Sequence, residues 1–145
     1  MLVVERTEAD VLALHVAGGA PQMVEHDGAK WAGVRVDKPW GHEVEIYRAG
    51  AVSITRLSIN PGAETSLHCH LTKDALLLVE DGICNIEFLG HVAILGAGEC
   101  VHIKRGVFHR TRTEKGATVI EVEAPANKCD LVRIGDRYGR AGLGY

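Results

Sequence analysis

The sequence predicts an all-β protein, a sandwich or barrel of short strands joined by tight turns. From Val34 onward, runs rich in apolar residues are separated by glycine-containing turn signals roughly every eight to twelve residues, which is the spacing typical of such folds. Several of these runs alternate apolar and polar residues, as strands with one buried face do. Helix is expected at only two places, after a capping residue at Thr7 and between Lys128 and Ile134.

The turn signals give the positions of the expected strands. These strands cover residues 34–37, 44–47, 51–59, the segment that carries His68 and His70, and residues 76–79, 83–89, 92–95, 101–103, 108–113 and 118–122. The run from Leu76 to Val79 is apolar throughout, which indicates a strand buried on both faces. Asp81-Gly82 is interpreted as a turn after that strand, and residues 38–43 as a loop.

Residues 1–33 are predicted to form a short N-terminal extension, and residues 34–145 a single domain. Within the extension, Thr7 and Asp10 have the spacing of a capping box at the start of a short helix. Gly18 and Gly19 end any such element. We expect the extension to cover a sheet edge or to contribute to a dimer contact.

The composition narrows the range of partners. A chain of 145 residues with a formal net charge of −3 is not expected to bind nucleic acid or an anionic membrane nonspecifically. No apolar run is as long as a membrane span, and acidic residues interrupt the N-terminus where a signal peptide needs an apolar core. A cytoplasmic location is therefore expected. The cysteines form no Cys-x-x-Cys pair and are interpreted as free thiols: Cys69, Cys84, Cys100 and Cys129.

Three histidines suggest a metal site. In an extended strand, residues two apart project from the same face, so His68 and His70 can point at one spot while Cys69 points away. One histidine in a strand is more often a surface or core residue than a ligand, but a third, His109, ends a second glycine-bracketed segment that begins at Gly98. Three neutral imidazoles suit a divalent transition metal such as zinc, manganese, iron or nickel.

These two segments resemble the conserved motifs of the cupin superfamily. The residues in register with the first motif are Gly62, His68, His70 and Gly82, and those in register with the second are Gly98, Gly106 and His109. The second motif departs from the family at two positions, where Lys104 replaces a proline and Thr113 an asparagine. The resemblance implies a double-stranded β-helix, or jelly-roll barrel, with a metal ion held inside it.

One branch of the superfamily is more similar than the others. The segments Pro39-Trp40-Gly41 and Asp136-Arg137-Tyr138-Gly139-Arg140 resemble those of the cupin domain of type II mannose-6-phosphate isomerases, which also occurs fused to mannose-1-phosphate guanylyltransferase. The resemblance runs from about Val34 to Arg140. It implies metal-dependent aldose–ketose isomerisation of a sugar phosphate in the barrel.

The chain departs from that branch at its metal site. The branch has Gln where this chain has His68, and it has a glutamate ligand followed by His where this chain has Ala75 and Leu76. Asp74 is adjacent to the ligand position, but an offset of one residue in a strand turns its side chain to the opposite face. The loss of the carboxylate removes a ligand and a plausible base for the proton transfer.

Other residues near the motifs are candidates for catalysis and substrate binding. His102 and Glu64, and with them Glu99, are candidate acid–base groups. For binding of a phosphate, the cationic candidates are Arg56, Lys104 and Arg137, since arginine forks and lysine charges bind phosphate. Strand alternation from His109 predicts that Arg110 and Arg112 point outward as solvated charges.

Three functions follow from these residues. The first is a metal-binding cupin of a sugar-phosphate or nucleotide-sugar pathway, with isomerisation as its reaction. The second is a non-catalytic cupin that binds a sugar-like ligand or a metal, and the third is a three-histidine iron dioxygenase acting on a small molecule. The expected partners are a small, phosphorylated or sugar-like ligand and a second copy of the chain, in a homodimer.

Overall fold

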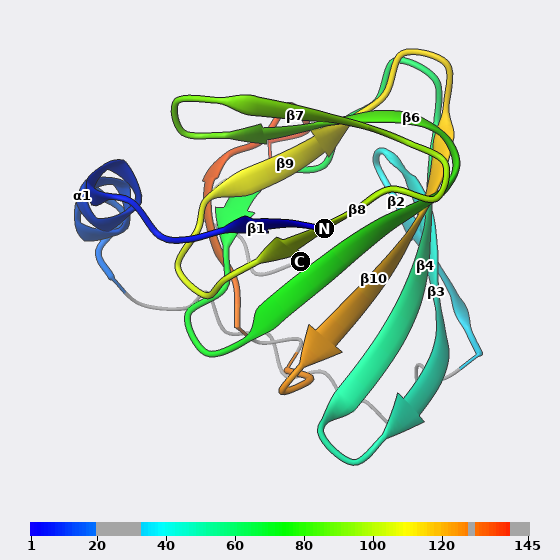
Figure 1. Ribbon diagram of the computed structural model, residues 1–145, viewed down its shortest axis with the longest axis horizontal. Coiled ribbons are helices and arrows are strands. Elements are labelled where there is room, and N and C mark those ends of the chain that lie inside the picture. The colour runs from blue at the N-terminus through cyan, green and yellow to red at the C-terminus, as the bar shows by residue number, and fades with distance from the viewer. Residues whose placement is uncertain (20–32, 128–129, 140–145) are drawn as a thin grey trace.

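The computed structural model describes residues 1–19, 33–127 and 130–139, and it confirms the all-β prediction (Figure 1). In the described residues, the strands are β1 (Leu2–Val4), β2 (Arg35–Lys38), β3 (Gly41–Ala49), β4 (Val52–Ile59), β5 (Leu67–Cys69), β6 (Asp74–Phe88), β7 (Val92–Gly96), β8 (Cys100–Ile103), β9 (His109–Arg112), β10 (Ala117–Ala124) and β11 (Val132–Gly135). One helix accompanies them in that part of the chain, α1 (Glu8–Val16).

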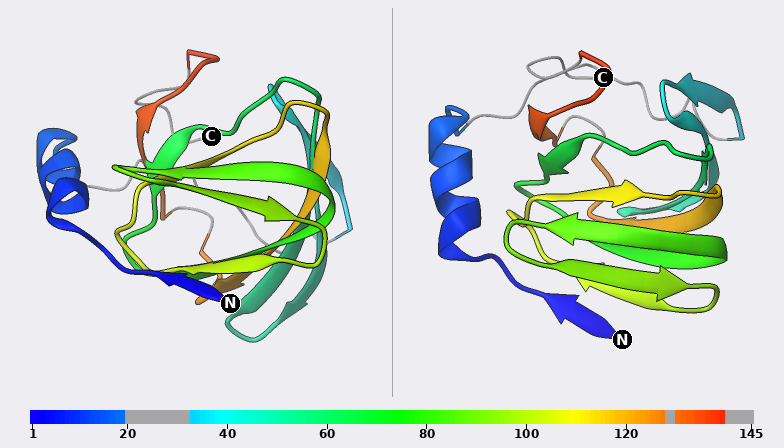
Figure 2. Two further views of the ribbon diagram at one scale, coloured as in Figure 1. Left: turned by 45° about the horizontal axis from the view of Figure 1, so that its top comes forward. Right: turned by 90° about the horizontal axis from the view of Figure 1, so that it is seen from above.

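The strands form one sheet that curls on itself (Figure 2). The neighbouring strands along its main path are β11-β5-β9-β6-β10-β4-β3-β2. The long strand β6 belongs to both parts of this sheet. Its first part pairs with β8 and β10, and its second part pairs with β7 and β9. The core lies on the inner face of the curl, where Leu77, Val79, Ile86 and Val119 are all buried.

The long strand β6 corrects two sequence predictions. Asp81-Gly82 does not reverse the chain, because the strand continues through it with a register shift against β10 and Gly82 at φ 86°. Residues 76–79 are also not buried on both faces, since Leu77 and Val79 are buried while the residues between and before them are half-buried. The turn chemistry of Asp-Gly is used here to bend a strand rather than to end it.

A third correction concerns residues 38–43, which were expected to be a loop. The turn is shorter than predicted, since β2 ends at Lys38 and β3 begins at Gly41. Gly41 has φ 149°, and a Cβ there would lie 1.9 Å from the Ser58 carbonyl oxygen. Glycine therefore lets β3 start close against β4, and Trp40 is buried beside it.

The N-terminal residues contain both of the elements that were considered for them. β1 lies parallel to β8 and covers its edge, and α1 stands at the side of the barrel (Figures 1 and 2). The capping box of Thr7 and Asp10 is confirmed. Asp10 is also buried and accepts a hydrogen bond from the backbone N–H of Phe108 at 2.8 Å, which ties the helix to the barrel. The boundary at residue 33 stays a prediction.

The helix expected between residues 128 and 134 is wrong for the described part of that segment. Val132 begins β11, which pairs with β5. Val132 packs with Cys69 and Phe108 in a second apolar cluster, and this packing and the strand pairing override the weak local preference for helix.

The cysteines of the described residues are free thiols. Cys69 and Cys84 are buried, whereas Cys100 is half-buried and Cys129 lies outside the described residues. Burial raises the pKa of Cys69 to about 12 and that of Cys84 to about 11. In the described ranges, no helix is long and apolar enough to cross a membrane.

Candidate metal centre

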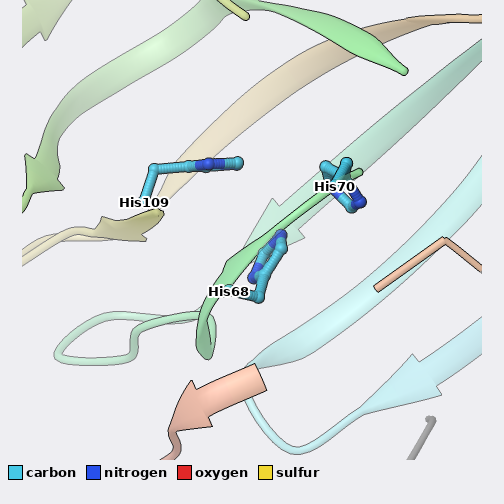
Figure 3. Close-up of side chains that lie close together, drawn as sticks. All are labelled: His68, His70 and His109. Carbon is cyan, nitrogen blue, oxygen red and sulfur yellow. The ribbon is translucent and has the colours of Figure 1, made fainter. Parts of the chain in front are cut away.

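The three predicted ligands come together on two adjacent strands. His68 lies on β5, His70 directly follows that strand, and His109 opens β9 as the register partner of His68. The ring centroids are 4.7 to 5.8 Å apart, and one nitrogen of each ring lies within 4.8 Å of the other two. Figure 3 shows the rings gathered around one space. These three histidines are thus positioned to bind a metal ion.

The backbone sets the tautomer of each imidazole. The Nδ1 atoms of His68, His70 and His109 each contact a backbone carbonyl oxygen, namely those of Ser66 at 2.8 Å, of Asp130, and of Val107 at 3.0 Å. A carbonyl only accepts, so each Nδ1 must carry the proton and each Nε2 has a free lone pair. Among the described residues, the buried Nε2 of His70 has no hydrogen-bond partner. A metal ion fits this donor set, because it would give Nε2 of His70 a partner. The Nδ1–H groups on the other side of the rings would keep the three ligands oriented through their hydrogen bonds to the backbone.

All three imidazoles are held neutral. Burial lowers the pKa of His70 to about 3 and that of His109 to about 4, and in both cases the Lys73 charge adds to the shift. Burial and the two neighbouring imidazoles hold the pKa of His68 well below its usual range. Neutral imidazole is the form that binds metal, so the site is ready for an ion at neutral pH.

Asp130 fixes the turn that follows His70. Its carboxylate accepts hydrogen bonds from the backbone N–H groups of Leu71 at 2.7 Å, Thr72 at 2.6 Å and Lys73 at 3.1 Å, and one from the Thr72 hydroxyl. Although burial acts in the other direction, these hydrogen bonds lower the pKa of Asp130 below its ordinary value. The same residue's carbonyl holds the His70 ring, so one residue positions both the ligand and its loop.

A cavity inside the barrel begins at the histidines and extends across the inner faces of the facing strands. The histidines share its wall with apolar and hydroxyl side chains such as Leu57, Leu77 and Thr111. Seven charged residues also line it: Lys38, Glu43, Glu45, Lys73, Glu121, Glu123 and Arg133. A cavity of this composition can bind a small polar molecule beside a metal ion.

The sequence reasoning did not select these charged residues. Arg133 is buried and lies opposite His68 in the β5–β11 pairing. Glu121 and Glu123 alternate with outward residues of β10, so they share the inner face with the buried Val119. Setting the phase of that strand from Val119 would have predicted both glutamates to point inward.

The arginines predicted to bind substrate lie elsewhere. Arg56 is on the outward face of β4, with its Nε 3.1 Å from a carboxylate oxygen of Glu80. Arg137 is exposed and donates a hydrogen bond to the carbonyl of Gly62 at 2.9 Å. Neither lines the cavity.

The remaining candidates also lie outside the cavity lining. His102 and Lys104 flank Asp74, with their Nε2 and Nζ atoms 3.5 and 3.3 Å from one of its carboxylate oxygens. The side chain of Glu64 accepts a hydrogen bond from Arg110 at 3.3 Å. Lys104 and Glu64 are thus engaged in ion pairs, with Asp74 and Arg110 respectively, away from the cavity.

Two further expectations can be compared with the structure. Arg112 is exposed as predicted, but Arg110 is not a freely solvated charge, because it is half-buried between Glu87 and Glu64. Glu99 is also away from the cavity, where its carboxylate accepts the backbone N–H of Gly96 at 3.1 Å.

Ala75 has the orientation predicted for the missing ligand. It is 2% exposed and lies on the inner face of β6. The residues two positions before and after it, Lys73 and Leu77, both line the cavity. Asp74 points the other way, toward Lys104. The neighbouring carboxylate therefore does not replace the one that position 75 lacks.

A curled β-sheet that brings together three histidines from β5, the residue after it and β9 has the cupin fold, and solved structures agree. KdgF from Halomonas sp. matches with a TM-score of 0.61 at 19% identity, over 65% of this chain and 89% of that one. A cupin-superfamily sugar phosphate isomerase from Silicibacter pomeroyi matches with a TM-score of 0.54 at 16% identity, over 59% of each chain.

The sequence comparison identifies a particular family among proteins with this fold. The chain belongs to the family described as mannose-6-phosphate isomerase, C-terminal, whose model matches residues 25–136. A mannose-1-phosphate guanylyltransferase from Escherichia coli is 28% identical over 109 residues, which are 72% of this chain and 23% of that protein. The chain thus spans about a quarter of the length of this relative.

Proposed function

We propose that this chain is a metal-binding cupin that takes a sugar phosphate, free or as part of a nucleotide sugar, in its cavity. The observation that carries the proposal is the convergence of one nitrogen from each of three imidazoles beside a cavity that also contains a buried arginine. The family supports it, since a relative is a mannose-1-phosphate guanylyltransferase and a protein of similar fold is a sugar phosphate isomerase.

The resident ion of this proposal is a divalent transition metal held by His68, His70 and His109. Zinc, manganese, iron and nickel all accept imidazole nitrogen. When bound, such an ion polarises a carbonyl or hydroxyl oxygen of the sugar as a Lewis acid. The backbone carbonyls that hold the three Nδ1–H groups keep the ligands oriented before the ion arrives.

Arg133 is the proposed partner of the phosphate group. It is 6% exposed, lines the cavity, and acts electrostatically on His68, whose pKa it lowers after the larger effects of burial and the other two imidazoles. A guanidinium binds phosphate through charge and paired N–H donors. A ligand with its anionic end at Arg133 therefore has its sugar close to the metal site.

The proposed reaction is aldose–ketose isomerisation, which needs a base to carry a proton between C1 and C2 of the sugar. Glu121 is the candidate for this base, because it is half-buried and projects from β10 into the cavity. Glu45 also lines the cavity, but its two oxygens accept hydrogen bonds from Arg48 at 2.8 and 2.7 Å.

The test is a measurement of metal content on protein purified without a histidine tag, followed by an assay for mannose 6-phosphate isomerisation. We expect a bound transition metal and turnover that is lost with a chelator and restored by the metal. Protein that binds neither a metal ion nor a sugar phosphate would overturn the proposal.

Ala75 favours a second candidate, a cupin that binds its ligand without turning it over, because the family's carboxylate ligand is absent there. The same experiment separates the two: metal and sugar phosphate binding without turnover supports the binding protein. Oxygen uptake by the iron-loaded protein, without turnover of sugar phosphate, would instead assign the site to the dioxygenase class.

A further inference from the structure

The structure contains a carboxylate directly opposite the position where the family's metal ligand is missing. In the antiparallel pairing of β6 and β10, the register partner of Ala75 is Glu123. Residues opposite one another in such a pair share one face of the sheet, with Cβ atoms about 4.5–5.5 Å apart. The side chain of Glu123 therefore starts beside the space that a glutamate at position 75 would enter.

Glu123 is a buried ion. It is 2% exposed, and so is Lys73, whose Nζ lies 2.7 Å from Oε1 of Glu123. The second oxygen, Oε2, accepts a hydrogen bond from the Ser53 hydroxyl at 3.4 Å, and Lys73 also donates to the carbonyl of Asn127 at 3.1 Å. Replacing a buried ion pair with apolar residues of the same size is often neutral or stabilising, so stability alone is a weak explanation for this pair.

The ion pair lies at the histidine end of the cavity. Lys73 is three positions after His70 and lines the cavity with it. Glu123 lines the same cavity, so both charged side chains lie on the wall that the three histidines also line.

The other carboxylates of the cavity are less suited to this role. Both oxygens of Glu45 are held by Arg48, and Glu43 pairs at 3.5 Å with Lys38 on the β2–β3 hairpin. Glu121 lies two residues before Glu123 in β10, where its partner on β6 is Leu77.

We propose that Glu123 supplies the carboxylate of the metal centre in place of the residue at position 75, and that Lys73 holds this carboxylate until the ion arrives. The inference rests on the three-histidine metal site of the proposed function. A divalent ion at the three Nε2 atoms repels the nearby ammonium and attracts the carboxylate, so the ion and Lys73 compete for Glu123. In the metal-free protein, the ion pair with Lys73 keeps the Glu123 carboxylate in place as a ligand for the ion.

The experiment compares variants with and without the carboxylate in the absence of the competing lysine. Lys73→Met retains Glu123, and Lys73→Met/Glu123→Gln removes the charge without leaving a buried unpaired ammonium. Each protein is stripped with a chelator, checked for folding by circular dichroism, and titrated with Co²⁺ alone. The Co²⁺ absorption spectrum reports the ligand set, and Glu45→Gln is the control for loss of a cavity carboxylate.

We expect Lys73→Met to bind Co²⁺ more tightly than the parent, and the double variant to bind about 10- to 100-fold more weakly than Lys73→Met, with a changed spectrum. Glu45→Gln should bind like the parent. Adding Ala75→Glu to the double variant should restore the affinity, because the carboxylate then returns from the facing strand.

The failures of the two proposals are distinguishable. If Lys73→Met and the double variant are folded and bind Co²⁺ with equal affinity and identical spectra, Glu123 is no ligand and the inference is overturned while the three-histidine site stands. If Ala75→Glu does not restore the Co²⁺ affinity of the folded double variant, a carboxylate at position 75 does not replace one at position 123, which also counts against the inference. If no protein in the series binds Co²⁺, the metal site itself is wrong and both proposals fall.

Discussion

At the scale of single residues, Asp130 is the residue on which the histidine loop depends. We expect Asp130→Ala to lower the free energy of unfolding by about 2–4 kcal/mol, since it leaves buried N–H groups without a charged acceptor. Thr72→Val, which removes only the hydroxyl bond to the same carboxylate, should cost about 1 kcal/mol. Urea unfolding of the metal-free proteins measures both. Equal losses for the two variants would contradict the central role of the carboxylate.

The buried imidazoles also make the stability of the metal-free protein depend on pH. Their pKa values are lowered in the fold, to about 3 for His70 and about 4 for His109, against 6.5 for the unfolded chain. Below pH 6.5 the unfolded chain therefore binds protons that the folded chain excludes, and the free energy of unfolding falls as the pH falls toward 4. The slope approaches about 1.4 kcal/mol per pH unit for each excluded proton.

Urea unfolding at pH 7.5, 6.0 and 5.0, with chelator present, measures this dependence. The control is a variant with Gln in place of His68, His70 and His109, which should lose most of the slope over this range. A parent protein whose stability is the same at pH 7.5 and pH 5.0 would show that the three imidazoles are accessible to protons.

A third prediction at this scale concerns the base. Glu121→Gln should reduce isomerase turnover by about 10²- to 10⁴-fold, the usual contribution of a general base, while metal affinity stays that of the parent. Glu45→Gln is the matched control, with the same substitution in the same cavity, and should retain turnover. A steady-state assay with metal titration on each variant separates the two readouts. Unchanged turnover in Glu121→Gln would remove this residue from the reaction.

The candidate site was predictable from the sequence only in part, and the reason is physical. His68 and His70 could be found because residues two apart in a strand share one face, and His109 could be found because its glycine-bracketed segment resembles the second cupin motif. Arg133 could not, because its place in the cavity depends on the pairing of β11 with β5, which are distant in the chain. Arg56 has the charge that a phosphate site needs, yet strand alternation turns it outward to Glu80.

At the scale of elements, the same distinction holds between local and long-range information. The capping box of α1 depends only on Thr7 and Asp10, which lie three positions apart in the chain, so it could be predicted. The continuity of β6 through Asp81-Gly82 could not, because it depends on partners on both sides of the strand that come from later parts of the sequence. Local turn chemistry was outweighed by hydrogen bonding along the whole strand.

The bend of β6 gives a prediction of its own. Gly82 and Gly90 both have positive φ, 86° and 103°, but a Cβ at Gly82 would lie 2.6 Å from the carbonyl oxygen of Gly116, whereas one at Gly90 meets nothing within 4 Å. In both alanine variants the positive φ should lower the free energy of unfolding by about 1–2 kcal/mol, and in Gly82→Ala the clash with the Gly116 backbone should lower it further. Thermal unfolding should show the larger loss for Gly82→Ala. Equal losses would mean that the bend relaxes at no cost.

At the scale of the whole molecule, the outer face of β6 and β7 remains to be accounted for. Ile83, Val92 and Ile94 are 63%, 53% and 68% exposed and lie on the outward face of these two strands, opposite the buried Cys84 and Leu95. No strand other than β6 pairs with β7 in the described residues, so its outer edge also offers backbone hydrogen-bonding groups. Adjacent exposed apolar side chains on a free strand edge are typical of a surface that another chain covers.

We therefore expect a homodimer in which two copies meet through this face. Ile94→Lys should shift the protein to monomer, because it places a charge at the centre of the contact, whereas Val16→Lys, at a still more exposed apolar position on α1, should leave the dimer intact. Sedimentation velocity at micromolar concentration measures the three proteins. The proposed metal site lies on the inner face of the barrel, so we expect Ile94→Lys to have the same metal affinity as the parent. A monomeric parent, or a dimer that survives Ile94→Lys but not Val16→Lys, would move the contact away from β7 and toward the N-terminal helix.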